Sequence, residues 1–224
     1  MDGLSMFLKY ALPPNILGYC GPDSPTQDKK SLLQFEGAVP YLRLIASANG
    51  IKDEFDEQVV EAYWLGNGLL KKVSDKNLYG NIENRFRKKM KSGDWFWLVS
   101  ESIPKAKPHH VFHVFDVYRR AGLLRSGAKD NIAETIDNCR IGWGKVIGIT
   151  DMASVEYAPI EFKEKKLEFG EKIIRKYYLP GPSIKIGDSV SLHWNHICDK
   201  ITERQKKNLV YWTKYHLNLT NQTI

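Results

Sequence analysis

Two residues far apart in the chain, Cys139 and His193, have the side chains best suited to chemistry in this sequence. Cys139 opens the glycine-broken run CRIGWGKV (139–146), and His193 closes the run GDSVSLH (187–193). Thiolate and imidazole are good ligands for soft and borderline transition metals, and together they also make a nucleophile–base pair. If the two runs form neighbouring strands, both side chains belong to one site.

The residue types at this pair leave two interpretations open. Arg140 follows Cys139, and a neighbouring cation lowers the pKa of a thiol, which favours the reactive thiolate. Two ligands are few for a structural metal site, which is typical of a transient carrier. The alternative is a buried cysteine that packs as a small apolar side chain, beside a strand-end histidine bonded to backbone.

Three other residues are further candidate metal ligands. His109 and His113 are four positions apart and would share a helical face, as in many zinc pairs. Aromatic-rich packing explains the same pattern, because Phe112 and Phe115 lie among them. Cys20 lies in the segment GYCGPD (18–23), whose glycines allow a tight ligand-binding loop and equally an ordinary turn.

Composition excludes some classes of protein and leaves others open. The chain has 224 residues, 42% hydrophobic and 26% charged, so we expect a packed core in one large or two small domains. The three cysteines are too few for a disulfide framework, and we expect free thiols in a cytoplasmic protein. No apolar run is long enough to cross a membrane. The net charge of +7 is spread over several runs that fit solvated faces.

The residue pattern predicts helices in the first part of the chain and strands in the second. Residues 1–30 are rich in Pro and Gly and are predicted to be irregular. Hydrophobic periodicity then predicts helices at 31–50, 53–73, 78–90, 109–118 and 130–139. Alternating and β-branched residues predict strands at 145–149, 154–157, 166–169 and 172–177. A capping box from Thr202 to Gln205 begins a C-terminal helix.

These elements predict an α+β protein with two domains. Residues 1–126 form a mostly α-helical domain of unknown function. Residues 127–224 form a small OB-like β-barrel with a C-terminal helix, because short strands at this spacing are typical of such barrels.

The second part of the chain resembles the hydrogenase assembly chaperones of the HypC/HupF type. The barrel of that family begins Met-Cys-x-x-x-Pro-Gly-x-Val, which the run from Asn138 to Val146 resembles, with Trp143 in place of the proline. The family's second signature, Gly-Asp-x-Val-x-x-His, matches residues 187–193. The resemblance covers about a third of the chain. It implies an OB-like barrel in which Cys139 and His193 carry an iron fragment for a hydrogenase-related or other metalloenzyme partner.

One departure separates the chain from that family. The family cysteine is the N-terminal residue after loss of methionine, whereas Cys139 lies within the chain and has no free α-amine. The N-terminal half resembles an uncharacterised family of archaeal and bacterial proteins in three stretches, LPPNILGYCGPD (12–23), EAYWLGN (61–67) and PHHVFHVF (108–115). No activity follows from that second resemblance.

We therefore expect a cytoplasmic carrier or chaperone module that binds a metal, iron or zinc, through Cys139 and His193. The chain has no phosphate-binding glycine loop and no nucleophile elbow, so we expect binding rather than catalysis. One alternative is a cysteine- or metal-dependent enzyme with its site between the two domains. Another is an OB-like nucleic-acid-binding protein, which we do not expect because the aromatic residues sit mostly at core-like spacing.

Overall fold

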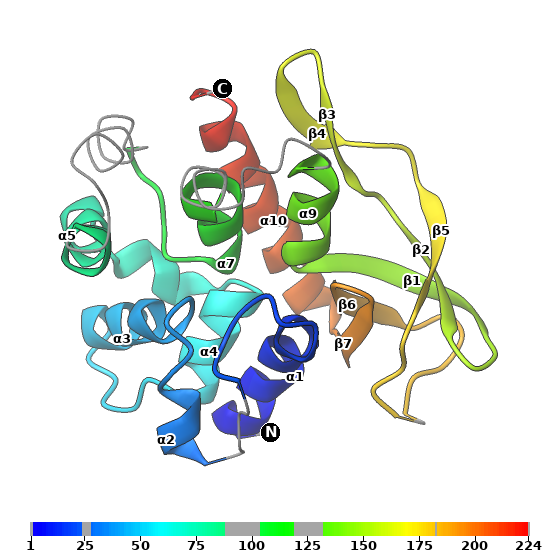
Figure 1. The fold of residues 1–224 in the computed structure, drawn as a ribbon, viewed down its shortest axis with the longest axis horizontal. Coiled ribbons are helices and arrows are strands. Elements are labelled where there is room, and N and C mark those ends of the chain that lie inside the picture. The colour runs from blue at the N-terminus through cyan, green and yellow to red at the C-terminus, as the bar shows by residue number, and fades with distance from the viewer. Residues whose placement is uncertain (1, 24–27, 88–103, 119–131, 182, 224) are drawn as a thin grey trace.

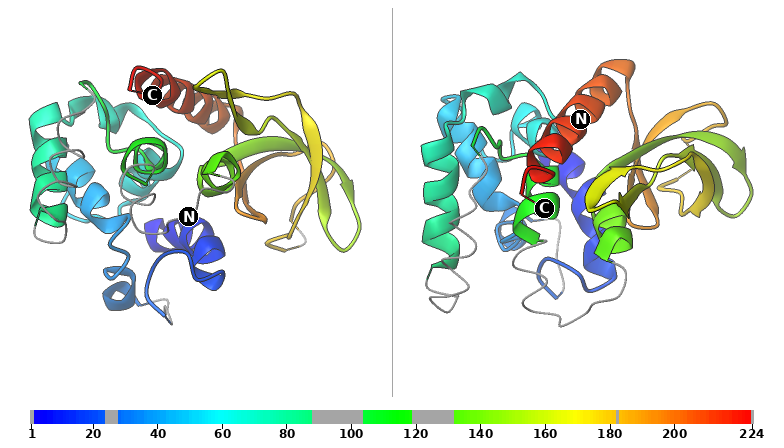
Figure 2. Two further views of the ribbon diagram at one scale, coloured as in Figure 1. Left: turned by 45° about the horizontal axis from the view of Figure 1, so that its top comes forward. Right: turned by 90° about the horizontal axis from the view of Figure 1, so that it is seen from above.

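The helices gather on one side of the molecule and the main sheet on the other, which confirms the α+β class (Figure 1). The computed structural model describes residues 2–23, 28–87, 104–118, 132–181 and 183–223. Helix α10 crosses between the two sides in all views (Figure 2). Within these residues, no helix combines the length and the apolar character needed to cross a membrane.

The helices of the first part begin almost at the N-terminus. They are α1 (Gly3–Ile16), α2 (Lys29–Leu32), α3 (Val39–Ala48), α4 (Glu57–Trp64), the short 3-10 helix η1 (Gly68–Lys72) and α5 (Asp75–Phe86). Two predicted helices are each split in two. The helix predicted at 31–50 is replaced by α2 and α3, and the helix predicted at 53–73 is replaced by α4 and η1. The described part of the predicted helix 78–90 lies in α5.

The prediction of irregular backbone over residues 1–30 is wrong, because α1 occupies half of it. Asp2 caps this helix by accepting a hydrogen bond from the Ser5 amide. Its inner face buries Phe7 and Tyr10 in the core. The two prolines, at positions 13 and 14, lie near the end of the helix, where they remove only its last backbone bonds.

Three further segments bring the chain to the sheet. They are α7 (His110–Phe112), the π-helical turn η2 (His113–Tyr118) and α9 (Ile132–Cys139). The predicted helices at 109–118 and 130–139 correspond to these segments. The predicted domain boundary after residue 126 lies outside the described residues and stays a prediction.

Five antiparallel strands form the main sheet. In the order of the sheet they are β5 (Ile173–Tyr177), β2 (Ala153–Tyr157), β1 (Gly142–Ile149), β6 (Ser189–His193) and β7 (His196–Lys200). The strands β3 (Ile160–Lys163) and β4 (Lys166–Phe169) pair separately as a hairpin. The pairing of β1 with β6 sets Gly142 opposite Leu192, so Cys139 and His193 come to the same end of the sheet.

The prediction of a small OB-like β-barrel is wrong, because the five-stranded sheet does not close into a barrel. The edge strands β5 and β7 meet at one isolated parallel bridge, between Tyr178 and His196. The sheet stays open because the chain leaves β5 beside this bridge instead of continuing along β7. The predicted C-terminal helix is confirmed as α10 (Glu203–Thr220), with the Thr202–Gln205 capping box in place.

The largest buried cluster joins the two ends of the chain. Side chains of α1, α3 and α4 pack in it with Ile141 before β1, Cys198 of β7, and Leu209 and Trp212 of α10. A second cluster lies on the sheet itself. Burial of apolar surface is the main stabilising term in such a core, so the N-terminal helices and the C-terminal helix support each other.

Candidate metal centre

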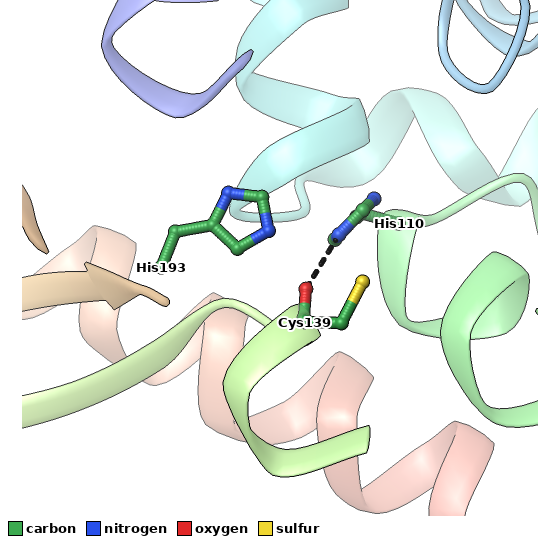
Figure 3. A group of neighbouring side chains, drawn as sticks. All are labelled: His110, Cys139 and His193. Carbon is green, nitrogen blue, oxygen red and sulfur yellow. Dashed lines mark hydrogen bonds between the residues drawn. The ribbon is translucent and has the colours of Figure 1, made fainter. Parts of the chain in front are cut away.

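Three side chains from three different elements converge at the end of the sheet. His110 begins α7, Cys139 ends α9, and His193 ends β6 (Figure 3). One ligand atom of each lies within 4.8 Å of the other two. His193 and His110 are buried and Cys139 is half-buried. Among the described residues this is the one group of three or more His, Cys, Asp or Glu side chains that could hold a metal ion.

A buried ion pair fixes the backbone on which Cys139 sits. Nε of Arg140 donates to Oδ1 of Asp137 over 3.0 Å, and the same oxygen accepts the Ile160 amide at 2.7 Å. Arg140 also donates to the carbonyl of Ala158, and its side chain is only 1% exposed. Asp137 and Arg140 flank Cys139, so this ion pair holds the junction of α9 with β1 on both sides of the cysteine. Breaking a buried ion pair costs about 3–5 kcal/mol of folding free energy.

Cys139 itself keeps its proton in this environment. Burial raises the pKa of the thiol well above its usual range, and the nearby Cys20 thiol raises it further. The expectation that Arg140 lowers this pKa is therefore wrong, because the guanidinium is paired with Asp137. A bound cation would displace the proton, as thiols deprotonate when they ligate a metal.

His193 presents one nitrogen without a partner. Its Nδ1 lies 2.7 Å from the carbonyl oxygen of Tyr10 in α1, so Nδ1 carries the proton and donates it. Its Nε2 is buried and has no hydrogen-bond partner in the described part of the chain. Figure 3 shows one ring nitrogen of His193 directed toward the other two residues. Burial lowers the pKa of His193 to about 4, so this nitrogen keeps its lone pair.

His110 lies in a chain of contacts that has one proton too few. The Tyr63 hydroxyl oxygen is 3.1 Å from the Gly37 carbonyl oxygen and 3.1 Å from Nδ1 of His110. On the other side of the ring, Nε2 is 2.8 Å from the Cys139 carbonyl oxygen. Each contact needs one proton, and Tyr63 with a neutral imidazole supplies two. A third would make His110 cationic, but burial lowers the pKa of His110 well below its usual value.

The three residues line one side of a cavity of about 240 Å³. Its walls are largely apolar and aromatic, and the Trp64 ring packs against the rings of both His110 and His193, with centroids 4.7 and 5.9 Å away. No Asp, Glu, Lys or Arg is among the described residues that line it. A neutral cavity of this kind stabilises a charged ligand only through the donor atoms in its walls.

Two of the other predicted ligands, Cys20 and His113, line the same cavity. Cys20 is exposed at its mouth, and surrounding protein atoms raise the pKa of the thiol to about 11. Nδ1 of His113 lies 3.3 Å from the Tyr41 hydroxyl, and burial with the positive charge of Arg85 lowers the pKa of His113 to about 3. The cavity therefore collects four of the five residues singled out from the sequence.

His109 lies apart from this group. It caps α7, where its Nδ1 accepts a hydrogen bond from the Val111 amide at 3.3 Å, and its ring stacks on His216. His109 and His113 do not share one helical face, because α7 begins only at His110 and a π-helical turn follows at His113. His110 belongs to the same run of histidines, but the spacing argument did not select it as a ligand, because its partners come from α4, α9 and β6.

The remaining residues near His193 in the sequence do not join the site. Cys198 is buried in the main core with Ile201, and the ring of His196 lies against Tyr178 at 5.1 Å. Both positions therefore contribute to packing.

Fold and site together define an α+β protein with a buried His–Cys–His cluster beside a small neutral cavity. The chain belongs to a family of unknown function, DUF6390, whose family model matches residues 1–224. This membership agrees with the resemblance to an uncharacterised family, and similarity to the HypC/HupF chaperones is not found. Neither the curated proteins nor the solved structures contain a match.

Proposed function

We propose that this protein binds one metal ion, zinc or iron, through His110, Cys139 and His193, and carries it to a partner protein. The observation that carries the proposal is the convergence of the three ligand atoms to within 4.8 Å of one another. Two imidazoles and one thiolate form a ligand set that borderline transition metals favour.

The distances fit an ion after a small contraction. With metal–sulfur and metal–nitrogen bonds of about 2.3 and 2.0 Å, tetrahedral ligand atoms lie about 3.3–3.6 Å apart. The three side chains would have to draw together by about 1 Å, from no more than 4.8 Å. The unpartnered Nε2 of His193 gains a partner by that movement. Its Nδ1–H remains on the Tyr10 carbonyl, which is the usual outer contact of a metal-bound histidine.

The hydrogen bonds of His110 also favour a cation. If an ion binds Nε2, the proton of the ring moves to Nδ1 and is donated to Tyr63. The Tyr63 hydroxyl then donates to the Gly37 carbonyl, and the cation replaces the missing third proton. The ion would take the place of the contact with the Cys139 carbonyl, so a small rotation of the ring is part of the proposal.

Carriage fits this site better than catalysis. The described cavity wall has no carboxylate, and burial lowers the pKa of His113, its remaining histidine, to about 3, so neither offers a strong general base beside a metal-bound water. The order of the two motifs around Cys139 and His193 supports a metalloenzyme as the recipient, hydrogenase-related as the sequence resemblance implies. The cavity itself favours a second candidate function, a metal-dependent enzyme for a small neutral molecule.

The test is metal analysis of the full chain under anaerobic conditions. The protein is loaded with zinc(II) or iron(II), desalted and analysed. We expect one ion per chain for the wild type and none for Cys139→Ser. The buried Cys198→Ala is the matched control, because it removes a thiol outside the cavity, and we expect it to bind like the wild type. Metal retention that is the same in wild type and Cys139→Ser would refute the proposal.

Release of the ion separates the two candidate functions. A carrier has to give up its ion, so we expect a chromophoric chelator to remove zinc from the folded protein within minutes. An ion that stays bound for hours against excess chelator would instead favour the enzyme.

A further inference from the structure

We propose that Cys20 is the fourth ligand of this site and that its thiolate, from the loop at residues 17–23, closes the site over the ion. The inference rests on the proposed function and deepens it, because it turns a three-ligand cluster into a Cys2His2 site. Four ligands from two cysteines and two histidines form a familiar closed tetrahedral site for zinc.

Hydrogen bonds and close packing hold the loop that carries Cys20 at the mouth of the cavity. The Asn15 side-chain amide donates to the carbonyls of Cys20 and Pro22 over 2.8 and 2.9 Å. Gly21 has a φ of +94°, and a Cβ there would lie 2.4 Å from a ring carbon of Phe35. Only glycine fits such a position. The loop is thus packed directly on Phe35, which is itself part of the cavity wall.

A ring contact ties the same loop to the turn that follows His193. The Tyr19 ring stacks on Trp194, with centroids 3.7 Å apart and planes at 16°. Trp194 is next to His193 and has a φ of +52°, which is uncommon for a bulky residue. Cys20 and His193 therefore belong to two segments that are held against each other by their neighbours.

Cys20 borders the same space as Cys139 and His193, because all three residues line the cavity. Cys20 is not part of the group whose ligand atoms already converge, so the loop has to bring its thiol closer when the ion binds. Nε2 of His193, a residue only 1% exposed, has no partner among the described residues. This nitrogen is an observation independent of Cys20, and together with the convergence of His193 with His110 and Cys139 it indicates that the space holds a ligand.

The net charge of the site favours a second thiolate ligand. A divalent ion bound by Cys139 and two neutral imidazoles keeps one positive charge. The described residues of the cavity wall offer no carboxylate to neutralise it, and an uncompensated buried charge is costly. A thiolate from Cys20 makes the site neutral. Because Cys20 is exposed and Cys139 is half-buried, Cys20 is also the ligand that a recipient protein reaches first.

Cobalt(II) is the probe for this inference, because its thiolate charge-transfer absorption grows with the number of bound sulfurs. The full-length wild type, Cys20→Ser and the control Cys198→Ala are titrated with cobalt(II), and zinc affinity is measured by competition with a chelator. We expect Cys20→Ser to show about half of the wild-type charge-transfer intensity. Its zinc affinity should fall by about 100-fold or more, beyond what the loss of an outer contact costs. Cys198→Ala should match the wild type.

Proton release gives a second reading of the same ligand set. A cysteine thiol is mostly protonated at neutral pH already, and burial raises the pKa of both Cys20 and Cys139 further. Zinc binding in weak buffer should therefore release about two protons from the wild type and about one from Cys20→Ser. Thermal unfolding of the metal-free proteins checks that the variants remain folded.

The outcomes separate this inference from the proposed function. Equal spectra, affinities and proton release for wild type and Cys20→Ser, with binding lost in Cys139→Ser, would overturn the role of Cys20 alone. Absence of cobalt and zinc binding by the wild type would overturn both.

Discussion

Two adjacent residues, His109 and His110, lead into two buried clusters of very different character. The His109 ring stacks on His216 with centroids 6.0 Å apart and planes at 5°, and Trp212 extends the stack. The His110 ring meets His193 nearly edge-on, at 5.2 Å and 76°. Both clusters are buried and both hold histidines whose pKa is lowered by burial. The first belongs to the packing of α7 on α10, and the second faces a cavity.

Burial alone does not distinguish a histidine that could bind a ligand from one that only packs in the core. Nε2 atoms of His109, His216 and His193 are all buried without a partner in the described parts of the chain. Only the His193 nitrogen has a thiol and a second imidazole within 4.8 Å. A lowered histidine pKa or an orphaned nitrogen is therefore weak evidence for a ligand. Convergence of several donors on one space is the stronger criterion.

The sharpest test of this comparison removes one imidazole from each cluster. His193→Ala should lower zinc affinity by about 100-fold or more, beyond the cost of losing an outer contact. His216→Phe should leave the affinity unchanged, because the His216 ring is stacked in the other cluster. Isothermal titration with zinc(II) measures both. If His216→Phe also weakens binding to that extent, the two clusters do not act separately and the distinction fails.

Ligand-linked stability gives the same contrast without a binding assay. Zinc at about 1,000 times its dissociation constant stabilises a folded protein by about 4 kcal/mol. We expect this full shift in the unfolding of wild type and His216→Phe. In His193→Ala an affinity lower by about 100-fold leaves zinc at only about 10 times the dissociation constant, so the shift should fall to about 1.4 kcal/mol. An undiminished shift in His193→Ala would mean that the ion binds elsewhere.

A smaller loss of zinc affinity is expected when the Tyr63 hydroxyl, which contacts Nδ1 of His110, is removed. Tyr63→Phe keeps the ring that packs on His110 but removes the contact with Nδ1. The proposed tautomer of metal-bound His110 loses its acceptor, so zinc affinity should fall by about tenfold. Tyr41→Phe, which removes a hydroxyl next to His113 instead, is the matched control and should cost less. Equal losses in both variants would show that Tyr63 has no special part in orienting His110.

The same comparison explains how much the sequence alone could predict. Four of the strands, the capped C-terminal helix and the pair Cys139–His193 have signals in the sequence, namely alternation, the Thr202–Gln205 box and the two motifs that hold the pair. His110 has only its place in a run of histidines, because it became a candidate ligand when α4, α9 and β6 were brought around it. The i, i+4 spacing of His109 and His113 looked stronger, yet the helix begins one residue too late to use it.

Long-range contacts also account for two of the errors in the fold. Helix α1 forms in spite of its prolines because Phe7 and Tyr10 are fully buried against elements distant in sequence. Periodicity in a Pro-rich segment does not report that burial. Whether five strands close into a barrel depends on the edge strands β5 and β7, which come together only at Tyr178 and His196. Strand patterns predict pairing partners better than closure.

The smallest expected effect is a pH dependence of the free energy of unfolding that comes from the stacked cluster of His109, Trp212 and His216. Burial lowers the pKa of His216 well below that of an unfolded chain, and it lowers that of His109 to about 3. Below about pH 6.5 the unfolded state therefore binds protons that the folded state does not, and the free energy of unfolding decreases as the pH falls. Each such histidine should contribute a loss of about 0.7 kcal/mol between pH 7 and pH 6.

Urea unfolding of the metal-free protein at the two pH values measures this loss. The wild type and His216→Phe should differ in pH dependence by about the share of one histidine, whatever their difference in absolute stability. In zinc-saturated protein the dependence should steepen, because acid also competes with the ion for the thiolates, and it should do so in wild type and His216→Phe alike. If removal of His216 abolishes the zinc-dependent part instead, the stacked histidines are coupled to the cavity, and the boundary between a packing cluster and a binding cluster has to be redrawn.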